Sequence, residues 1–400
     1  MKQEKVSEFF EKAKNKIAFF ISEAKVPLIL IIILLLVDLI LGMITRAAVD
    51  SMPEQNITVQ YSDDKCSQVS VFFAQECSVD DSYIKKMEYD FKNKLSDEAG
   101  FDPEKMEISS CFSAQGTVSI EYEKTSISDI NAIGVAGDFF FFHTLDYISG
   151  GPFTNDPTMS NCIVIDDGVA WDLFGSTDVC GKVVYINEFP HYISGVIRKK
   201  EGRIYDASGL KEKTIFMSYN SLCMYGQIFS GRTVEKEISE KGEKARFGGI
   251  NCYEIVCPSP VDGIVKKYIS ESCGYDGRFV HICENSERFE FIPLLGVIAS
   301  FGTRSMWQKA IFYPYVENIA RGYEDILSIL LIIRIFLRVS VGVTVILFVK
   351  SFNAHKEIDL HSFMEKLADK KYELEVKMND RKKEKKRRSK WEKDDLPGEY

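Results

Sequence analysis

Two long apolar segments of this sequence contain charged residues whose type and spacing point to a specific interaction. The segment 26–49 contains Asp38, and the segment 326–349 contains Arg334 and Arg338, one helical turn apart. A charged side chain at bilayer depth costs about 2.5–3.5 kcal/mol or more and is found where a partner compensates it. Counted from the outer ends of the segments at about 1.5 Å per residue, Asp38 lies between the two arginines in depth. The sequence therefore predicts an intramembrane ion pair of Asp38 with Arg338 or with Arg334.

One arginine remains in excess of the single acid. This excess charge indicates a second acid, supplied by another protein or by a second copy of the chain, and it fits a subunit better than a solitary anchor. The alternative is that both arginines reach water or lipid phosphate unaided and that Asp38 is protonated.

The distribution of cysteine is a second chemical signal. All ten cysteines lie between Cys66 and Cys283, and none lies in the apolar segments or the terminal tails. Disulfides form in oxidising compartments outside the cytoplasm, so this confinement indicates an exported, oxidised domain. The local pairs Cys162 with Cys180 and Cys66 with Cys77 are the first candidates for disulfides. The alternative is that several of the ten are buried thiols.

Two further patterns do not amount to a catalytic or metal site. Four residues separate Cys252 from Cys257, but no histidine or second close cysteine pair completes a zinc site. Three histidines lie among aromatic or strand residues, and no nucleophile signature surrounds any cysteine. These histidines are His143, His191 and His281. We therefore expect no catalytic residue, no cofactor and no metal, and we do not expect an enzyme.

The segment 175–183, GSTDVCGKV, is superficially similar to a phosphate-binding loop. Five residues rather than four separate Gly175 from Gly181, and Val183 stands where such a loop has the magnesium-binding Ser or Thr. This segment therefore does not predict a nucleotide site, and an ATP-driven function would require a separate ATPase subunit.

The two apolar segments exceed the length of about 18 residues that a membrane-spanning helix needs. The first is too long, and the residues before it too charged, for a cleaved signal peptide. Residues 1–49 carry 7 Lys and Arg against 5 Asp and Glu, residues 326–400 carry 17 against 12, and the loop between them carries 26 against 42. Because positively charged flanks stay in the cytoplasm, we expect a cell-membrane protein with both termini cytoplasmic and residues 50–325 extracytoplasmic.

The outer region alternates between strand and helix patterns. A helix over 80–100, between strands at 68–76 and 109–124, forms one β-α-β unit. Its apolar face consists of Ile84, Met87, Phe91 and Leu95. A second unit consists of a strand at 249–258, a helix at 259–274 and a strand or strand pair at 278–292. Two such units around an insert predict an α+β fold, with a split β-α-β layer and an inserted α/β subdomain.

The insert contains the most informative run of the sequence. Residues 163–197, IVIDDGVAWDLFGSTDVCGKVVYINEFPHYISGVI, predict a buried strand, a short helix, glycine-containing turns and two alternating strands. This order of strand, helix, LFG, GK and strand resembles the MacB-like periplasmic core domain of FtsX-type ABC transporter permeases. The aromatic segment 134–154 resembles the part of that family before its G-R-F-F turn, with Pro152 where arginine is usual.

The resemblance implies a porter-like subdomain, formed by the two β-α-β units, and a stalk that transmits motion between the outer domain and the membrane. The resemblance also implies a role in an ABC-type efflux or mechanotransmission system. The implied partners are a separate ABC ATPase subunit and either a further permease subunit or a second copy of this chain. Such permeases usually have three spans after the domain, whereas one span and a hydrophilic tail follow here, so transport by this chain alone is in doubt. The alternative is a stand-alone, membrane-anchored extracellular binding or sensing module without transport activity.

The tail is strongly basic between residues 378 and 395. Basic residues near anionic inner-leaflet lipid gain about 1 kcal/mol each, so we expect the tail to bind lipid; the alternative is a solvated charge run that sets topology. We do not expect a nucleic-acid partner. The expected organisation is a cytoplasmic segment 1–25, transmembrane helix 26–49, first porter-like half 50–150, inserted subdomain 151–248, second porter-like half 249–292, juxtamembrane stalk 293–325, transmembrane helix 326–349 and basic cytoplasmic tail 350–400.

Overall fold

The computed structural model of the chain divides into two compact units, Met1–Gly42 with Ile333–Tyr400, and Met43–Ile332. It describes residues 2–52, 54, 57–61, 65–99, 107–154, 160–210, 212–238, 244–259, 261–304 and 311–394. The side chains of residues 2–24, 59–60, 98–99, 210, 304, 351–367, 382 and 384–394 are outside this description. Residues 305–310 of the expected stalk, and much of the basic tail, therefore lie outside the described side chains.

Each apolar segment lies within a longer helix. Helix α1 spans Lys2–Asp50, and helix α10 spans Tyr315–Asp394 without interruption. The parts Lys25–Asp50 and Tyr315–Lys350 are long and apolar enough to cross a membrane. Pro314 immediately precedes α10, as expected for a residue that cannot continue a helix toward its N-terminus. The last residues of the expected stalk therefore belong to the same helix as the second span.

The unit Met43–Ile332 is built on an 11-stranded sheet with the order β13-β1-β12-β2-β3-β8-β5-β7-β4; β6 and β9 attach to it through β2. Neighbouring strands are antiparallel except for β3 with β8 and β5 with β7. The strands are β1 Cys66–Phe73, β2 Ser109–Tyr122, β3 Thr125–Gly137, β4 Tyr147–Gly150, β5 Cys162–Asp166, β6 Val183–Ile186, β7 Phe189–Ile197, β8 Thr214–Ser218, β9 Gln227–Ile228, β12 Ile250–Pro258 and β13 Val280–Glu284. A separate ribbon consists of β10 Thr233–Glu237 and β11 Lys244–Gly248.

The two β-α-β units expected from the sequence meet in this sheet. Strand β1 of the first unit pairs with β12 and β13 of the second, and β12 also pairs with β2. The strands of the insert extend the same sheet, because β8 pairs with both β3 and β5. The sequence did not predict this continuity, since an alternating pattern specifies the two faces of a strand and not its neighbours.

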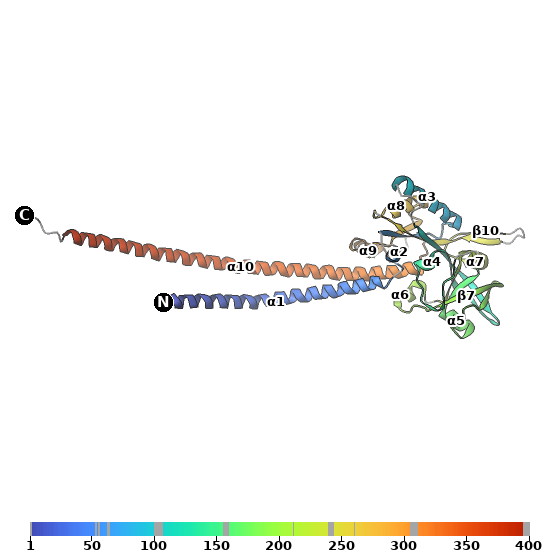
Figure 1. Cartoon of the computed structure of the whole chain (residues 1–400), viewed down its shortest axis with the longest axis horizontal. Helices are drawn as coiled ribbons and strands as arrows, with labels where there is room; N and C mark the ends of the chain where they lie inside the picture. The colour runs from blue at the N-terminus through green and yellow to red at the C-terminus, as the bar shows by residue number, and fades with distance from the viewer. Residues whose placement is uncertain are drawn as a thin grey trace, which may run out of the picture. The chain divides into compact units, whose positions relative to one another are not determined.

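Helices α3 Asp81–Ala99 and α8 Ile264–Cys273 lie side by side against the sheet (Figure 1). All four residues of the predicted apolar face of α3 are buried, so that prediction is confirmed. The pattern over 278–292 forms one strand, β13, and is followed by helix α9 Phe291–Arg304, so a strand pair is not formed there. The remaining helices are α2 Ile57–Tyr61, α4 Phe139–Phe142, α5 Asp167–Phe174, α6 Arg203–Tyr205, the π-helical turn η3 Asp206–Leu210 and α7 Tyr219–Tyr225.

The sheet has two chemically different faces near β1 and β12. On one face, Phe73 packs edge-on against Tyr83 of α3, and Tyr253 donates a hydrogen bond to Glu88 of α3. Successive side chains of a strand point to opposite faces. Ser70 of β1 and Glu254 of β12, which are opposite each other in the ladder, therefore lie on the other face. That second face is buried but polar, and it positions the groups described next.

Candidate functional site

The structure brings together the three intramembrane charges that the sequence singled out. Arg334 Nε donates to Asp38 Oδ1 at 2.9 Å, and Arg338 Nε donates to Asp38 Oδ2 at 3.2 Å. One carboxylate thus binds two guanidinium groups, where the sequence predicted a pair with one of them. We call Asp38, Arg334 and Arg338 the intramembrane charge cluster.

A glycine makes room for this cluster on α1. A Cβ atom at Gly42, one turn after Asp38, would lie 3.1 Å from Arg334 Nη2. The side chain of Arg338 is 56% exposed, whereas that of Asp38 is 16% exposed. The cluster therefore keeps one positive charge in excess and presents it on the outside of the described helix pair.

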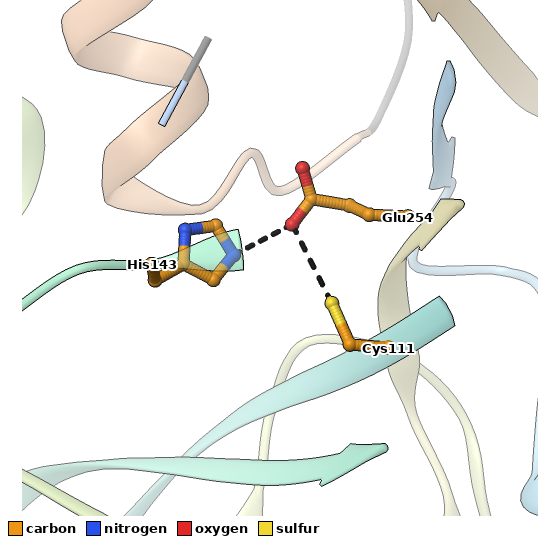
Figure 2. Close-up of side chains that lie close together, drawn as sticks. All are labelled: Cys111, His143 and Glu254. Atoms are coloured by element: carbon orange, nitrogen blue, oxygen red, sulfur yellow. Dashed lines mark hydrogen bonds and ion pairs between the residues drawn. The ribbon is translucent and has the colours of Figure 1, made fainter. Parts of the chain in front are cut away.

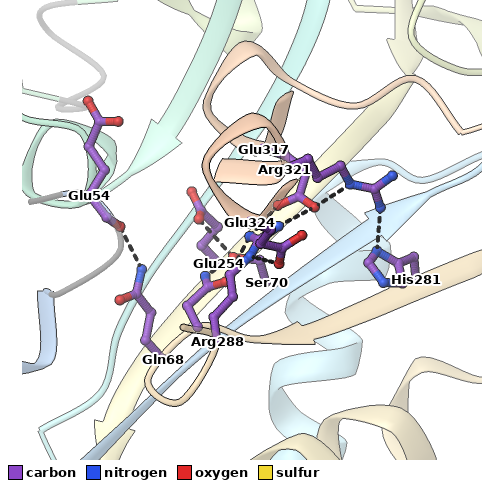
Figure 3. A network of polar contacts seen from close by, with 10 residues as sticks. Glu54, Gln68, Ser70, Glu254, His281, Arg288, Glu317, Arg321 and Glu324 are labelled. Atoms are coloured by element: carbon purple, nitrogen blue, oxygen red, sulfur yellow. Dashed lines mark hydrogen bonds and ion pairs between the residues drawn. The ribbon is translucent and has the colours of Figure 1, made fainter. Parts of the chain in front are cut away.

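A second charged group lies where α10 begins, on the polar face of the sheet (Figure 3). Arg288 forms a bidentate pair with Glu317 at 2.6 and 2.9 Å, and its Nε donates to Glu324 at 2.5 Å. Arg321 donates to Glu317 at 2.7 Å and also contacts His281 at 3.3 Å. We call these five residues the α10-root network. It joins the segment after β13 to the first three turns of α10.

The α10-root network is deeply buried. Arg288, Glu317 and Glu324 are 4%, 2% and 7% exposed. Burial lowers the pKa of Arg288, but Glu317, Cys283 and Glu324 outweigh burial and hold that pKa well above its ordinary value. Removing one partner from such a buried pair is costly, because the other charge is left without compensation in a region of low dielectric constant. The network therefore fixes the first turns of α10 to the sheet.

Hydrogen bonds extend this network across the sheet to β12. Arg288 Nη1 donates to Asn285 Oδ1 at 3.4 Å, and Asn285 Nδ2 donates to Ser70 Oγ at 2.7 Å. Ser70 Oγ in turn donates to Glu254 Oε1 at 2.9 Å. A continuous polar path therefore links α10 to Glu254.

Glu254 also belongs to a group of three side chains of types that can bind a metal ion (Figure 2). Its Oε2 lies 2.6 Å from His143 Nε2 and 3.9 Å from Cys111 Sγ. Cys111 comes from β2, His143 directly follows α4, and Glu254 comes from β12. All three are at most 5% exposed. The sequence did not reveal this group, because its members lie far apart in the chain and have no recognisable spacing.

The candidate disulfides have different outcomes. Cys66 begins β1, and Cys77 follows its far end, so the eight-residue strand separates them. An extended strand of this length spans about 23 Å, whereas a disulfide requires Cα atoms within about 7 Å of each other. This separation argues against the Cys66–Cys77 pair. Cys162 and Cys180 are free thiols in the structure, and their pairing stays a prediction.

The other two histidines that the sequence singled out, His191 and His281, have ordinary environments. His191 is fully buried in β7, where its Nδ1 lies 3.0 Å from the Phe189 carbonyl oxygen, and burial lowers its pKa. His281 stacks on Phe72 and contacts Arg321. His143 is the histidine whose importance the sequence analysis missed.

No family model and no curated protein sequence matches this chain. Among solved structures, the periplasmic region of MacB from Actinobacillus actinomycetemcomitans matches with a TM-score of 0.36 and 13% identity, covering 60% of this chain and 94% of that chain. The extracellular domain of the noncanonic ABC-type transporter YknZ from Gram-positive bacteria matches with a TM-score of 0.32 and 15% identity, covering 54% and 99%. Oligomeric Cmr4 from Pyrococcus furiosus matches with a TM-score of 0.22 and 10% identity, covering 56% and 99%. TM-scores this low do not establish a common fold.

Proposed function

We propose that this chain is a permease-like or accessory membrane subunit of an ABC-type efflux or mechanotransmission system, with an extracellular MacB-like domain. In this proposal the chain is not itself an enzyme, and a separate ABC ATPase subunit supplies the energy. Both termini lie in the cytoplasm, and residues 50–325 lie outside the cell membrane.

The observation that carries this proposal is the continuity of α10. This helix begins on the sheet at Tyr315 and continues through the apolar segment to Asp394. The buried pairs of Arg288 with Glu317 and Glu324 fix its first turns to the sheet. Because these first turns are fixed to the sheet, we infer that a movement of the sheet would displace this end of α10. This is the property that a mechanotransmission subunit requires.

Two further features support the proposal. The run over residues 163–197, which carries the MacB-like resemblance, forms the successive elements β5, α5, β6 and β7. The intramembrane charge cluster keeps one net positive charge, because two guanidinium groups share one carboxylate, and an acid of a further permease subunit or of a second copy of the chain would neutralise it. We also propose that the basic tail binds anionic lipid of the inner leaflet.

Co-purification from native membranes tests this function. The full-length chain, tagged at its N-terminus, is extracted in a mild detergent, and the bound proteins are identified by mass spectrometry. We expect an ABC ATPase subunit among them in near-stoichiometric amount. An unrelated two-span membrane protein with the same tag serves as the control.

A chain that is recovered folded and monomeric, with no ATPase above the control, contradicts the proposal. That result would favour the alternative of a stand-alone extracellular binding or sensing module. Chemical cross-linking in intact cells before extraction distinguishes the loss of a weak partner from its absence.

A further inference from the structure

The group of Cys111, His143 and Glu254 combines three different donor atoms in one buried place. Thiol sulfur, imidazole nitrogen and carboxylate oxygen all lie within 4.8 Å of one another. Two of the residues are held by neighbouring strands, since Cys111 of β2 is directly opposite Glu254 of β12. The main chain of the sheet therefore preorganises two of the three donors.

From this geometry we propose that Cys111, His143 and Glu254 bind a divalent, thiol-seeking cation, with Zn²⁺ as the preferred ion. Zinc accepts exactly this mixture of sulfur, nitrogen and oxygen donors, and sites with three protein ligands leave a fourth position open. The thiolate and the carboxylate together balance the charge of a divalent ion. The inference concerns metal binding and does not depend on the proposed function.

The distances between the three donor atoms differ only slightly from those of a tetrahedral zinc site. Tetrahedral zinc sites, with bonds of about 2.0–2.3 Å, place neighbouring donor atoms about 3.3–3.6 Å apart. The distance of 3.9 Å between Cys111 Sγ and Glu254 Oε2 is close to this value. The distance of 2.6 Å between His143 Nε2 and Glu254 Oε2 must widen, as it does when a shared proton is replaced by a metal ion.

The surroundings of Glu254 resemble those of a metal ligand. Its other oxygen, Oε1, accepts a hydrogen bond from Ser70 Oγ, and Asn285 holds Ser70 in turn. Hydrogen bonds of this kind orient a carboxylate ligand and raise metal affinity. A cavity of about 10 Å³ is lined by His143, Glu254 and Cys252, among others.

Metal binding replaces the contacts among Cys111, His143 and Glu254 by bonds from each side chain to the ion. In the metal-free site, Cys111 Sγ and His143 Nε2 both lie near Glu254 Oε2, at 3.9 and 2.6 Å. When the ion binds, the thiol proton and the proton on His143 Nε2 leave to solvent, and sulfur and nitrogen each form a bond to the metal. The neutral imidazole keeps its proton on Nδ1. For a site that begins with a neutral thiol, a doubly protonated imidazole and a carboxylate, the total charge is zero before and after binding.

Cobalt spectroscopy on the full-length protein tests this proposal. The protein is purified in detergent without a polyhistidine tag, stripped with a chelator and titrated with Co²⁺ and then with Zn²⁺. We expect one equivalent of Co²⁺ to produce the intense visible bands of a tetrahedral site and a thiolate-to-cobalt charge-transfer band, and Zn²⁺ to remove both. The absence of a charge-transfer band in the folded wild-type protein overturns the proposal without reference to any variant.

Variants assign the ligands. Cys111→Ser should abolish the charge-transfer band, and Glu254→Gln should weaken Co²⁺ binding at least tenfold. Cys223→Ser is the matched control, because Cys223 is also a buried thiol but lies on α7, away from the group. Circular dichroism of each variant verifies folding. A band that survives in folded Cys111→Ser, or is lost in Cys223→Ser, contradicts the assignment. X-ray absorption of the Zn²⁺-loaded wild type should show sulfur together with nitrogen or oxygen neighbours.

Discussion

At the scale of single residues, ion pairs connect parts of the chain that lie far apart in the sequence. Asp38 binds both Arg334 and Arg338, although the sequence predicted a pair with one of them. The sequence could identify these residues because charges in an apolar segment are conspicuous. It could not identify the group of Cys111, His143 and Glu254, because those residues become neighbours only through strand pairing and the turn after α4.

Reversing the charge of Asp38 tests the intramembrane charge cluster. Asp38→Arg places three cations together at bilayer depth, so we expect a several-fold loss of membrane accumulation, measured by quantitative immunoblotting of membrane fractions. Adding Arg338→Asp restores one acid and two bases, and accumulation should recover. If the double variant accumulates no better than either single variant, the pairing is not what stabilises these helices.

Arg288 is the residue on which the α10-root network depends. Arg288→Met leaves Glu324 buried without this guanidinium and leaves Glu317 with Arg321 as its ion-pair partner, so we expect a loss of about 3–5 kcal/mol in the free energy of unfolding. Urea unfolding of the full chain in detergent, followed by near-ultraviolet circular dichroism, measures this loss. Arg278→Met is the matched control, because the pair of Arg278 with Asp276 is exposed and should change stability by less than about 1 kcal/mol. Equal effects of the two substitutions would show that the network contributes nothing specific.

At the scale of elements, the sequence predicted what depends on local periodicity. The apolar face of α3 and the strands near 66–73, 109–122 and 250–258 follow from spacing and appear close to their predicted bounds. Residues 315–325 of the juxtamembrane stalk expected over 293–325 belong to the same helix as the second span. The polar residues Glu317, Arg321 and Glu324 interrupt the apolar pattern of the sequence, although they lie along one face of the helix. Arg288 pairs with both glutamates, and Arg321 pairs with Glu317.

The N-terminus of α3 provides a pH-dependent prediction. Asp80 accepts a hydrogen bond from the Tyr83 main-chain N–H and pairs with Lys236. Burial raises the pKa of Asp80, but the pairs with Lys236 and Tyr83 outweigh it and lower the pKa below its ordinary value of 3.8. A lowered carboxyl pKa stabilises the fold above the unfolded-state value, and this stabilisation is lost as pH falls through the folded-state value.

Asp80→Ala should therefore cost about 0.5–2 kcal/mol in the free energy of unfolding near neutral pH. The difference from wild type should begin to shrink below about pH 3.8, where the unfolded chain takes up a proton, and it should be smallest below the lower folded-state pKa, where the carboxyl group is protonated in both states. Urea unfolding at a series of pH values measures this difference in the free energy of unfolding. Asp80→Ser is the control, because it keeps a capping oxygen without the charge. A difference that does not change with pH would assign the effect to the cap alone.

At the scale of the whole molecule, the outer unit includes the first turns of α10. Ile311 pairs with Ala74 and is fully buried, and Asn251 donates to the Phe312 carbonyl oxygen at 2.6 Å. A fragment ending near residue 290 lacks these contacts and leaves Arg288 without its acids. A fragment of residues 51–325 should therefore unfold at a clearly higher temperature than one of residues 51–290. Equal melting temperatures would show that the root of α10 is dispensable for the outer unit.

The central claim is that this chain couples an extracellular domain to an ATP-driven partner in the membrane. The most direct measurement is ATP hydrolysis by the complex purified through the tagged full-length chain. We expect vanadate-sensitive hydrolysis that co-elutes with the chain and clearly exceeds that of the two-span control protein. Full-length, folded chain that elutes without ATP hydrolysis above this control would contradict the claim.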